Sequence, residues 1–183
     1  MLNMVLGRVY NAVLAFSILL FSSYTGNEPR FADFLVEVTE NGIYFSCMLY
    51  EAFENDFREL FESGIMTSVS YQIDIFHQRN LIQRKTITNT AIYENEMRHW
   101  ILQLGEDNNT LYVDSFEELK HNLSFLETFI YFHTGRYDNV ELNISASLPV
   151  VHFPTLQKNV DLMVLWKLKE PKARLNINLR ETL

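Results

Sequence analysis

Residues 68–77 restrict the fold of this chain more than any other segment, because apolar and polar side chains alternate along them. The odd positions are apolar and the even positions polar over four successive repeats, with Val69, Tyr71, Ile73 and Ile75 alternating with Ser68, Ser70, Gln72 and Asp74. Successive side chains of a β-strand point to opposite faces. The pattern therefore predicts a strand with one buried face and one solvated face.

The same segment contains an aspartate and a histidine, Asp74 and His77, three positions apart. In a regular strand Asp74 points to solvent and His77 to the other face, so the two do not form an acid–base pair. Phe76 interrupts the alternation, which leaves open a bulge or a strand end close to it. We expect a solvated carboxylate and a histidine near the end of the strand.

Further segments with strand character predict a sheet of several strands, at residues 32–39, 43–53, 81–94, 98–104, 110–113, 140–148, 160–168 and 173–179. Asn41-Gly42 between the first two favours a hairpin with a type I′ turn, in which both central residues have positive φ. Half-buried strands are typical of antiparallel sheets. Strand–helix–strand spacing is missing, which disfavours a parallel, doubly wound fold.

Two segments have the period of a helix. Over residues 115–132, Ser115 and Glu118 match a capping box, and apolar residues follow at steps of three and four. Residues 55–63 predict a short helix that ends before Gly64. The expected fold class is α+β and mainly β: an antiparallel sheet or sandwich with one long covering helix at about 115–132 and one short helix at about 55–63.

The first 26 residues differ from the rest of the chain. Arg8 is their one charged residue, an apolar run follows at 12–21, and small or polar residues come next. This order describes an export signal. It predicts a signal peptide or N-terminal anchor at 1–26, then a single β-rich extracytoplasmic domain at 27–183, in the periplasm or cell envelope. An amphipathic or buried first helix is the alternative.

The charge of the chain limits its partners. Its 15 basic and 23 acidic residues give a net charge of −8, which disfavours nucleic acid and anionic lipid as partners. We expect membrane contact only through residues 1–26, if they are not cleaved. Cys47 is the single cysteine, so no internal disulfide forms, and its apolar surroundings in the sequence indicate a buried thiol.

The sequence shows no pattern that assigns chemistry. The five histidines stand at no metal-ligand spacing: His77, His99, His121, His133 and His152. Nucleophile-elbow, phosphate-loop and dinucleotide-binding motifs are missing. We therefore predict no catalytic, cofactor-binding or metal-binding residues, no cofactor, and a protein that is not an enzyme.

Several segments follow one another in an order that resembles a known family. They are FRELFESG at 57–64, VSYQIDIF at 69–76, Arg84-Lys85-Thr86-Ile87, Trp100-Ile101-Leu102, YVDSFEEL at 112–119, and the late segments LNISASLPV and LMVLWKL. This order is similar to an exported bacterial family called domain of unknown function 4390, over roughly residues 30–180. Where that family has more Arg and Leu, this chain has Asn, Ile and Glu. The resemblance implies an envelope protein of unknown biochemical role and supplies no catalytic residues.

Three hypotheses about function follow. The first is a non-enzymatic envelope protein that is structural or binds a protein partner, with exposed sheet edges available for strand addition. The second is a carrier of an apolar ligand such as a lipid, held between sheet and helix by aromatic residues: Trp100, Phe116, Phe125, Phe129 and Trp166. The third is a hydrolase whose histidines converge only in the fold.

Overall fold

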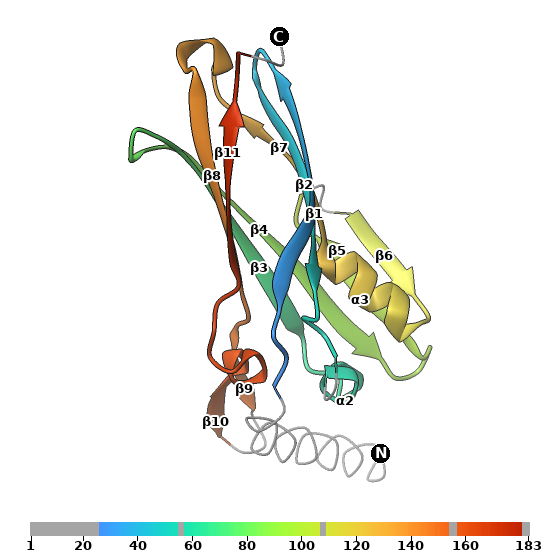
Figure 1. Ribbon diagram of the computed structural model, residues 1–183. Helices are drawn as coiled ribbons and strands as arrows, with labels where there is room; N and C mark the ends of the chain where they lie inside the picture. The colour runs from blue at the N-terminus through green and yellow to red at the C-terminus, as the bar shows by residue number, and fades with distance from the viewer. Residues whose placement is uncertain (1–25, 55–56, 107–108, 154–156, 181–183) are drawn as a thin grey trace.

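A computed structural model describes residues 26–54, 57–106, 109–153 and 157–180, which form an elongated, mainly β body (Figure 1). Apart from Gly26, the predicted signal segment lies outside these residues. Every described strand pairing is antiparallel, so the mainly β, antiparallel architecture is confirmed. In this part of the chain, each helix is too short or too polar to cross a bilayer.

The larger sheet has six strands in the order β11-β8-β3-β4-β5-β6. Their bounds are β3 (Thr67–His77), β4 (Asn80–Glu94), β5 (His99–Leu104), β6 (Asn109–Val113), β8 (Asn139–Ser147) and β11 (Lys172–Asn178). β3 to β6 form a meander, as the alternating segments and turns predict. β8 and β11 extend the sheet on the other side of β3, so the predicted strand at 68–77 is an interior strand.

The smaller sheet has three strands in the order β1-β2-β7. β1 (Arg30–Thr39) and β2 (Gly42–Tyr50) form a hairpin, and β7 (Phe125–Tyr131) joins β2 from far along the sequence. A separate ribbon contains β9 (Val150–Phe153) and β10 (Lys158–Asp161). Among the described strands β2 is the single partner of β7, so β7 is an edge of its sheet.

The two larger sheets share one hydrophobic core. Tyr71, Ile73 and Ile75 have no exposed surface, which confirms the buried face predicted for β3. The Tyr71 ring lies 6.3 Å from the ring of Phe31 in β1, and its hydroxyl donates a 2.6 Å hydrogen bond to the carbonyl of Leu123. Contact between opposing sheets is compatible with a β-sandwich.

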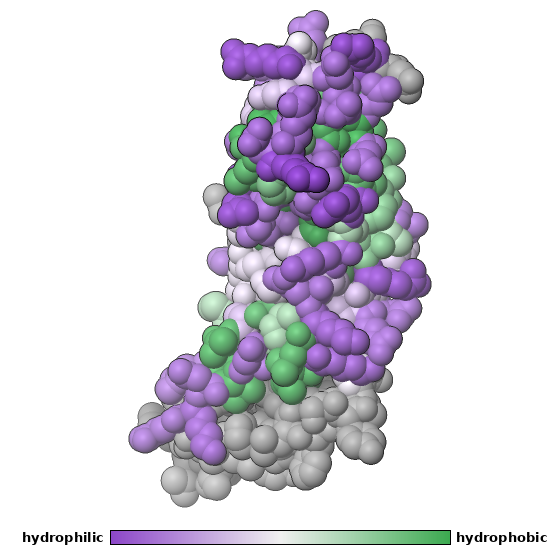
Figure 2. Space-filling model, turned by 60° about the vertical axis from the view of Figure 1, so that its left-hand side comes forward, coloured by the Kyte–Doolittle hydropathy of each residue, from purple (hydrophilic) through white to green (hydrophobic). Residues whose placement is uncertain are grey.

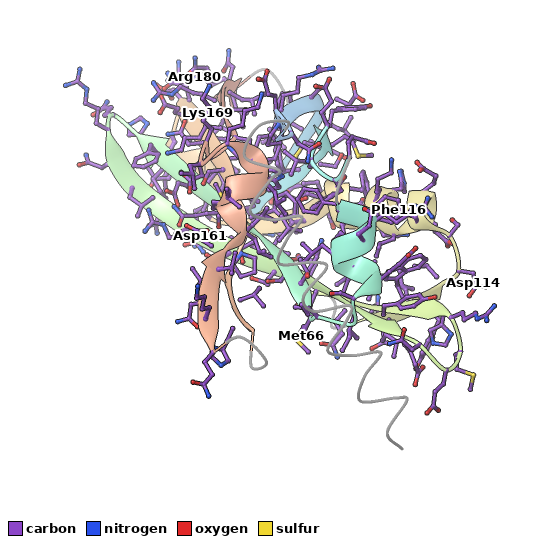
Figure 3. The ribbon with its side chains drawn as sticks, turned by 90° about the horizontal axis from the view of Figure 1, so that it is seen from below. Met66, Asp114, Phe116, Asp161, Lys169 and Arg180 are labelled. Carbon is purple, nitrogen blue, oxygen red and sulfur yellow. The ribbon has the colours of Figure 1, made fainter. Side chains whose placement is uncertain are left out.

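The short helix is confirmed as α2 (Phe57–Glu62), which buries Phe57, Leu60 and Phe61. Gly64 follows with φ +76°, the left-handed conformation that glycine adopts readily after a helix. The first two residues of the predicted helix, 55–56, lie outside the described residues. Phe61 packs 6.3 Å from Phe116, and Figure 3 shows Phe116 beside α2.

The prediction of one long covering helix at 115–132 is wrong. α3 spans Phe116–Ser124, and its predicted start is confirmed because the Ser115 hydroxyl accepts a 3.1 Å hydrogen bond from the amide of Glu118. From Phe125 onward the chain continues as β7. Leu126 and Ile130 are buried, and a step of four fits a helix face and a strand face equally well. Aromatic and β-branched residues favour a strand wherever a partner such as β2 is available.

The prediction of a strand at 160–168 is also wrong. After β10 the chain enters a 3-10 helix, η3 (Leu162–Trp166), capped by Asp161, whose carboxylate accepts a 2.9 Å hydrogen bond from the amide of Met163. Leu162, Leu165 and Trp166 are buried. The spacing of three and four between these residues is helical, so the apolar segment 160–168 fits both the period of a strand and that of a helix. The cap and the buried Trp166 favour the helical one.

The predicted hairpin between β1 and β2 is confirmed, but its turn differs from the expected type I′. Thr39 pairs with Gly42, so the loop residues are Glu40 and Asn41. Neither has a positive φ, whereas Gly42 has φ +155° at the first position of β2. The glycine is needed where β2 meets β7 and not within the loop.

Candidate functional site

The structure separates Asp74 from His77. Arg84 of β4 donates two hydrogen bonds to the Asp74 carboxylate, at 2.6 and 2.8 Å, and Gln72 donates a third at 3.0 Å. The His77 ring Nδ1 lies 2.9 Å from the carbonyl of Asn139. The bulge left open near Phe76 exists between Ile75 and Phe76, but it does not bring the two side chains together.

The prediction of a solvated Asp74 needs correction. Its side chain lies on the outer face of the sheet, as its parity requires, yet the residue is only 8% exposed. Arg84 stands directly across from it in the neighbouring strand and covers it. Because Arg84 hydrogen-bonds the charged form, the pKa of the Asp74 carboxyl is lowered.

We expect this pair to make the free energy of unfolding depend on pH. A carboxyl group whose pKa is lowered in the folded state stabilises the fold above its unfolded pKa of about 4, and that stabilisation is lost as the pH falls through the lowered value. Urea unfolding at pH 7 and pH 3 should show a smaller acid-induced loss for Asp74→Asn than for the wild type. The exposed Asp114, replaced by asparagine, serves as control. An equal loss in all three proteins would contradict this role of the pair.

The histidines do not converge on one site. His99 lies 3.1 Å from the Glu94 carboxylate across the β4–β5 hairpin, His152 lies 2.8 Å from the Asn159 side chain, and the His121 ring stacks on Phe125. Within the described ranges, no three His, Cys, Asp or Glu side chains are placed to hold a metal ion.

Cys47 is buried with 1% of its surface exposed, as its apolar surroundings predicted. Burial raises the pKa of its thiol to about 12, so the sulfur stays protonated at neutral pH. The thiolate needed for nucleophilic attack is therefore not available in the folded protein.

An exposed group of aromatic rings lies on the outer face of the three-stranded sheet. We call Tyr44, Phe129 and Tyr131 the aromatic patch. Phe129 stands opposite Tyr44 in the β2–β7 pairing, and its ring centre is 4.5 Å from that of Tyr44 and 4.5 Å from that of Tyr131. Tyr44 is 50% exposed and Tyr131 71% exposed. The rings hold one another in place while much of their apolar surface still meets solvent.

A groove of about 360 Å³ runs beside this patch along β7, and we call it the edge groove. Residues 125–129 of β7, from both faces of that strand, line one side of the groove. Side chains of β4, β5 and the turn after β5 line the other side. Its lining residues are Tyr44, Ile87, Asn89, Leu104, Glu106, Phe125, Leu126, Glu127, Thr128 and Phe129. The edge groove is thus mainly apolar, with two carboxylates and no basic side chain in its lining.

A polar network links β4 and the turn after β5 to β7 at the edge groove. The Lys85 ammonium donates hydrogen bonds to the Glu106 carboxylate at 2.6 Å and to the Phe129 carbonyl at 2.9 Å. The Thr128 hydroxyl donates to the same Glu106 oxygen at 2.9 Å. Both charged side chains are about a quarter exposed, so this ion pair is screened less than one on the open surface.

Another concave region lies on the outer face of the six-stranded sheet, near Asp74 and Arg174, with a volume of about 360 Å³. Its charged groups already have partners: Asp74 binds Arg84, and Arg174 lies 3.4 Å from Glu141. Figure 2 shows that hydrophilic residues cover much of the described surface in that view. We find no group there that awaits a ligand, whereas the aromatic patch leaves apolar surface uncovered.

Sequence reasoning missed the aromatic patch because it placed Phe125 and Phe129 on a buried helix face. The signal was present: Leu126, Thr128 and Ile130 alternate with Phe125, Glu127, Phe129 and Tyr131. The five aromatic residues expected to line one cavity are instead dispersed. Phe125 and Phe129 line the edge groove, Trp100 packs against Phe116, and Trp166 packs against Phe53.

Comparison of the chain with protein-family models, with curated proteins and with solved structures found no match. The resemblance to the domain of unknown function 4390 family therefore stays a prediction.

Proposed function

We propose that this protein is a non-enzymatic module of the cell envelope that binds another protein through the aromatic patch. The observation that carries the proposal is the patch itself: on one sheet face the Phe129 ring contacts the rings of both Tyr44 and Tyr131, and these two tyrosines have large exposed fractions. The envelope location depends on the export-like order of residues 1–26. Within the described residues the histidines have separate partners and Cys47 is buried.

The patch has the chemistry of a protein-binding surface. Tyrosine and phenylalanine bury large apolar areas when a partner covers them, and tyrosine keeps a hydroxyl for hydrogen bonding at the rim. Ring contacts within the patch restrict the side chains before a partner arrives, so binding loses less conformational entropy. A neighbouring edge strand and an apolar groove extend the surface beyond the rings.

A photo-crosslinking amino acid at position 131 tests the proposal in the native envelope. We expect a protein adduct from position 131 and a loss of most of it when Tyr44→Ser is added, because that change removes a ring that is 50% exposed and packs against Phe129. Tyr112 is a matched control position: it is 66% exposed and belongs to the other sheet. Thermal unfolding of each variant confirms the fold. Equal adduct yields with and without Tyr44→Ser would refute the proposal.

An apolar-ligand carrier is the second candidate, because Ile87, Leu104 and Phe125 give the edge groove apolar walls. Native mass spectrometry of the purified protein distinguishes it, since a carrier retains a lipid-sized mass that a protein-binding module lacks. The hydrolase alternative depends on converging histidines, whereas in the described part of the chain His99 lies beside Glu94, His77 beside the Asn139 carbonyl and His152 beside Asn159.

A further inference from the structure

We propose that the partner segment is an extended peptide with a basic residue, and that it adds to the free edge of β7 as a fourth strand of the three-stranded sheet. This inference rests on the proposed function, because it names how a protein partner is held. Strand addition takes its affinity from main-chain hydrogen bonds and its specificity from pockets for alternate side chains. The following observations locate both at β7.

The main-chain groups of alternate β7 residues point away from β2. In an antiparallel pair, the amide and carbonyl of one residue face the partner strand and those of the next residue face outward. The Phe129 carbonyl accepts its hydrogen bond from Lys85 of β4, so it faces outward. Glu127, two residues earlier, has the same orientation. Residues 127 and 129 therefore present a free edge of the kind to which another strand pairs.

The edge groove lies along this same edge. A strand paired with residues 127 and 129 would direct alternate side chains inward, toward Ile87 and Leu104. The remaining side chains would lie on the outer face beside Phe129 and Tyr44. Both faces of an added strand thus meet apolar surface. We therefore expect apolar residues on each face of the partner segment.

The charge of the groove selects a basic segment. Glu106 and Glu127 are its charged lining residues. Glu106 is already paired with Lys85, so the exposed Glu127 provides the negative charge that a partner meets. A second copy of this acidic chain would place carboxylates against carboxylates, which disfavours self-association through β7. A lysine or arginine on the outer face of the added strand pairs with Glu127 instead.

Lys85 occupies the position that the partner's main chain would take. Its ammonium satisfies the Phe129 carbonyl, as lysine side chains do at many free edges. An incoming amide replaces that bond, and Lys85 keeps its ion pair with Glu106. The opposite edge of the sheet is less suited to pairing, because a bulge between Ala32 and Leu35 interrupts β1 and Asp33 there has φ +53°.

The test uses a displayed library of random nine-residue peptides, selected on the purified protein. We expect enriched peptides with Lys or Arg among apolar residues. Two synthetic copies, each methylated at every second backbone nitrogen, should differ. The copy that loses the amides facing β7 should bind roughly tenfold more weakly or worse, and the other copy should bind almost as before. Enrichment of no peptide, or an equal effect of both parities, would overturn the inference.

Variants at position 127 test the edge itself. Glu127→Pro removes an amide that faces the edge and leaves the pairing with β2, so we expect peptide binding to be lost. Glu127→Ala keeps the amide and should weaken binding only several-fold. Equal binding by the two variants rules out strand addition, and a dimer seen in solution would assign the edge to a second copy. Either result leaves the crosslinking test of the aromatic patch unaffected, so failures of the two proposals are distinguishable.

Discussion

Replacing Gly42 with alanine is expected to lower the free energy of unfolding by about 3 kcal/mol, because no room exists for a side chain. A Cβ built at Gly42 would lie 2.1 Å from the carbonyl oxygen of Ile130 and 2.9 Å from the ring of Phe129. The backbone φ of +155° adds strain for any residue with a side chain. Urea unfolding of Gly42→Ala measures the loss.

Gly135→Ala is the matched control, because a Cβ at Gly135 would have no atom of a non-neighbouring residue within 4 Å. We expect its stability to stay within about 0.5 kcal/mol of the wild type. If Gly42→Ala were equally harmless, the close approach of β2 to β7 described here would be wrong. Gly42→Ala should also disturb the contact between Tyr44 and Phe129, because these two residues belong to the β2–β7 pair.

Replacing Trp166 with alanine is expected to lower the free energy of unfolding by about 4 kcal/mol, as large-to-small changes in a core do. The Trp166 side chain has no exposed surface, and its ring centre lies 6.2 Å from that of Phe53. Its indole N–H donates a 2.8 Å hydrogen bond to the carbonyl of Ala52. The substitution removes the packing and the hydrogen bond together.

Trp166→Phe separates these two contributions, because it keeps a ring and leaves the Ala52 carbonyl without its donor. We expect a smaller loss, about 2 kcal/mol. Leu168→Ala, two residues away at a side chain that is 68% exposed, should change stability little. If Leu168→Ala were as harmful as Trp166→Ala, the packing of η3 against the core would have to be revised.

Local patterns predicted the strands well. The buried face of β3, the β1–β2 hairpin, the meander and the cap of α3 each follow from a few adjacent residues whose period or hydrogen bonding has one solution. The two wrong predictions of secondary structure concern segments that fit two periods. Residues 125–131 form a strand because β2 is available to pair with them. Residues 162–166 form a helical turn because Asp161 caps it and Trp166 is buried.

The candidate site was only partly predictable from sequence, because the alternation at 125–131 indicates which side chains point outward but not which strand lies beside them. The aromatic patch exists only because β7 pairs with β2, which brings Phe129 opposite Tyr44. The cover over Asp74 depends on Arg84 standing across from it in β4. Such neighbours are set by strand order and register, and periodicity gives which face a residue occupies but not what stands beside it.

Residues far along the sequence complete the hydrophobic core, and this affects when the chain can fold. The hydrogen bond between Trp166 and Ala52 joins positions 114 residues apart, and the last strand, β11, pairs with β8 near the end of the chain. Contacts between distant residues form slowly. A polypeptide emerging from the ribosome therefore lacks a complete interior until Trp166 and the residues of β11 have been synthesised. Such delay is compatible with threading through a translocation channel as an unfolded chain, as the predicted export requires.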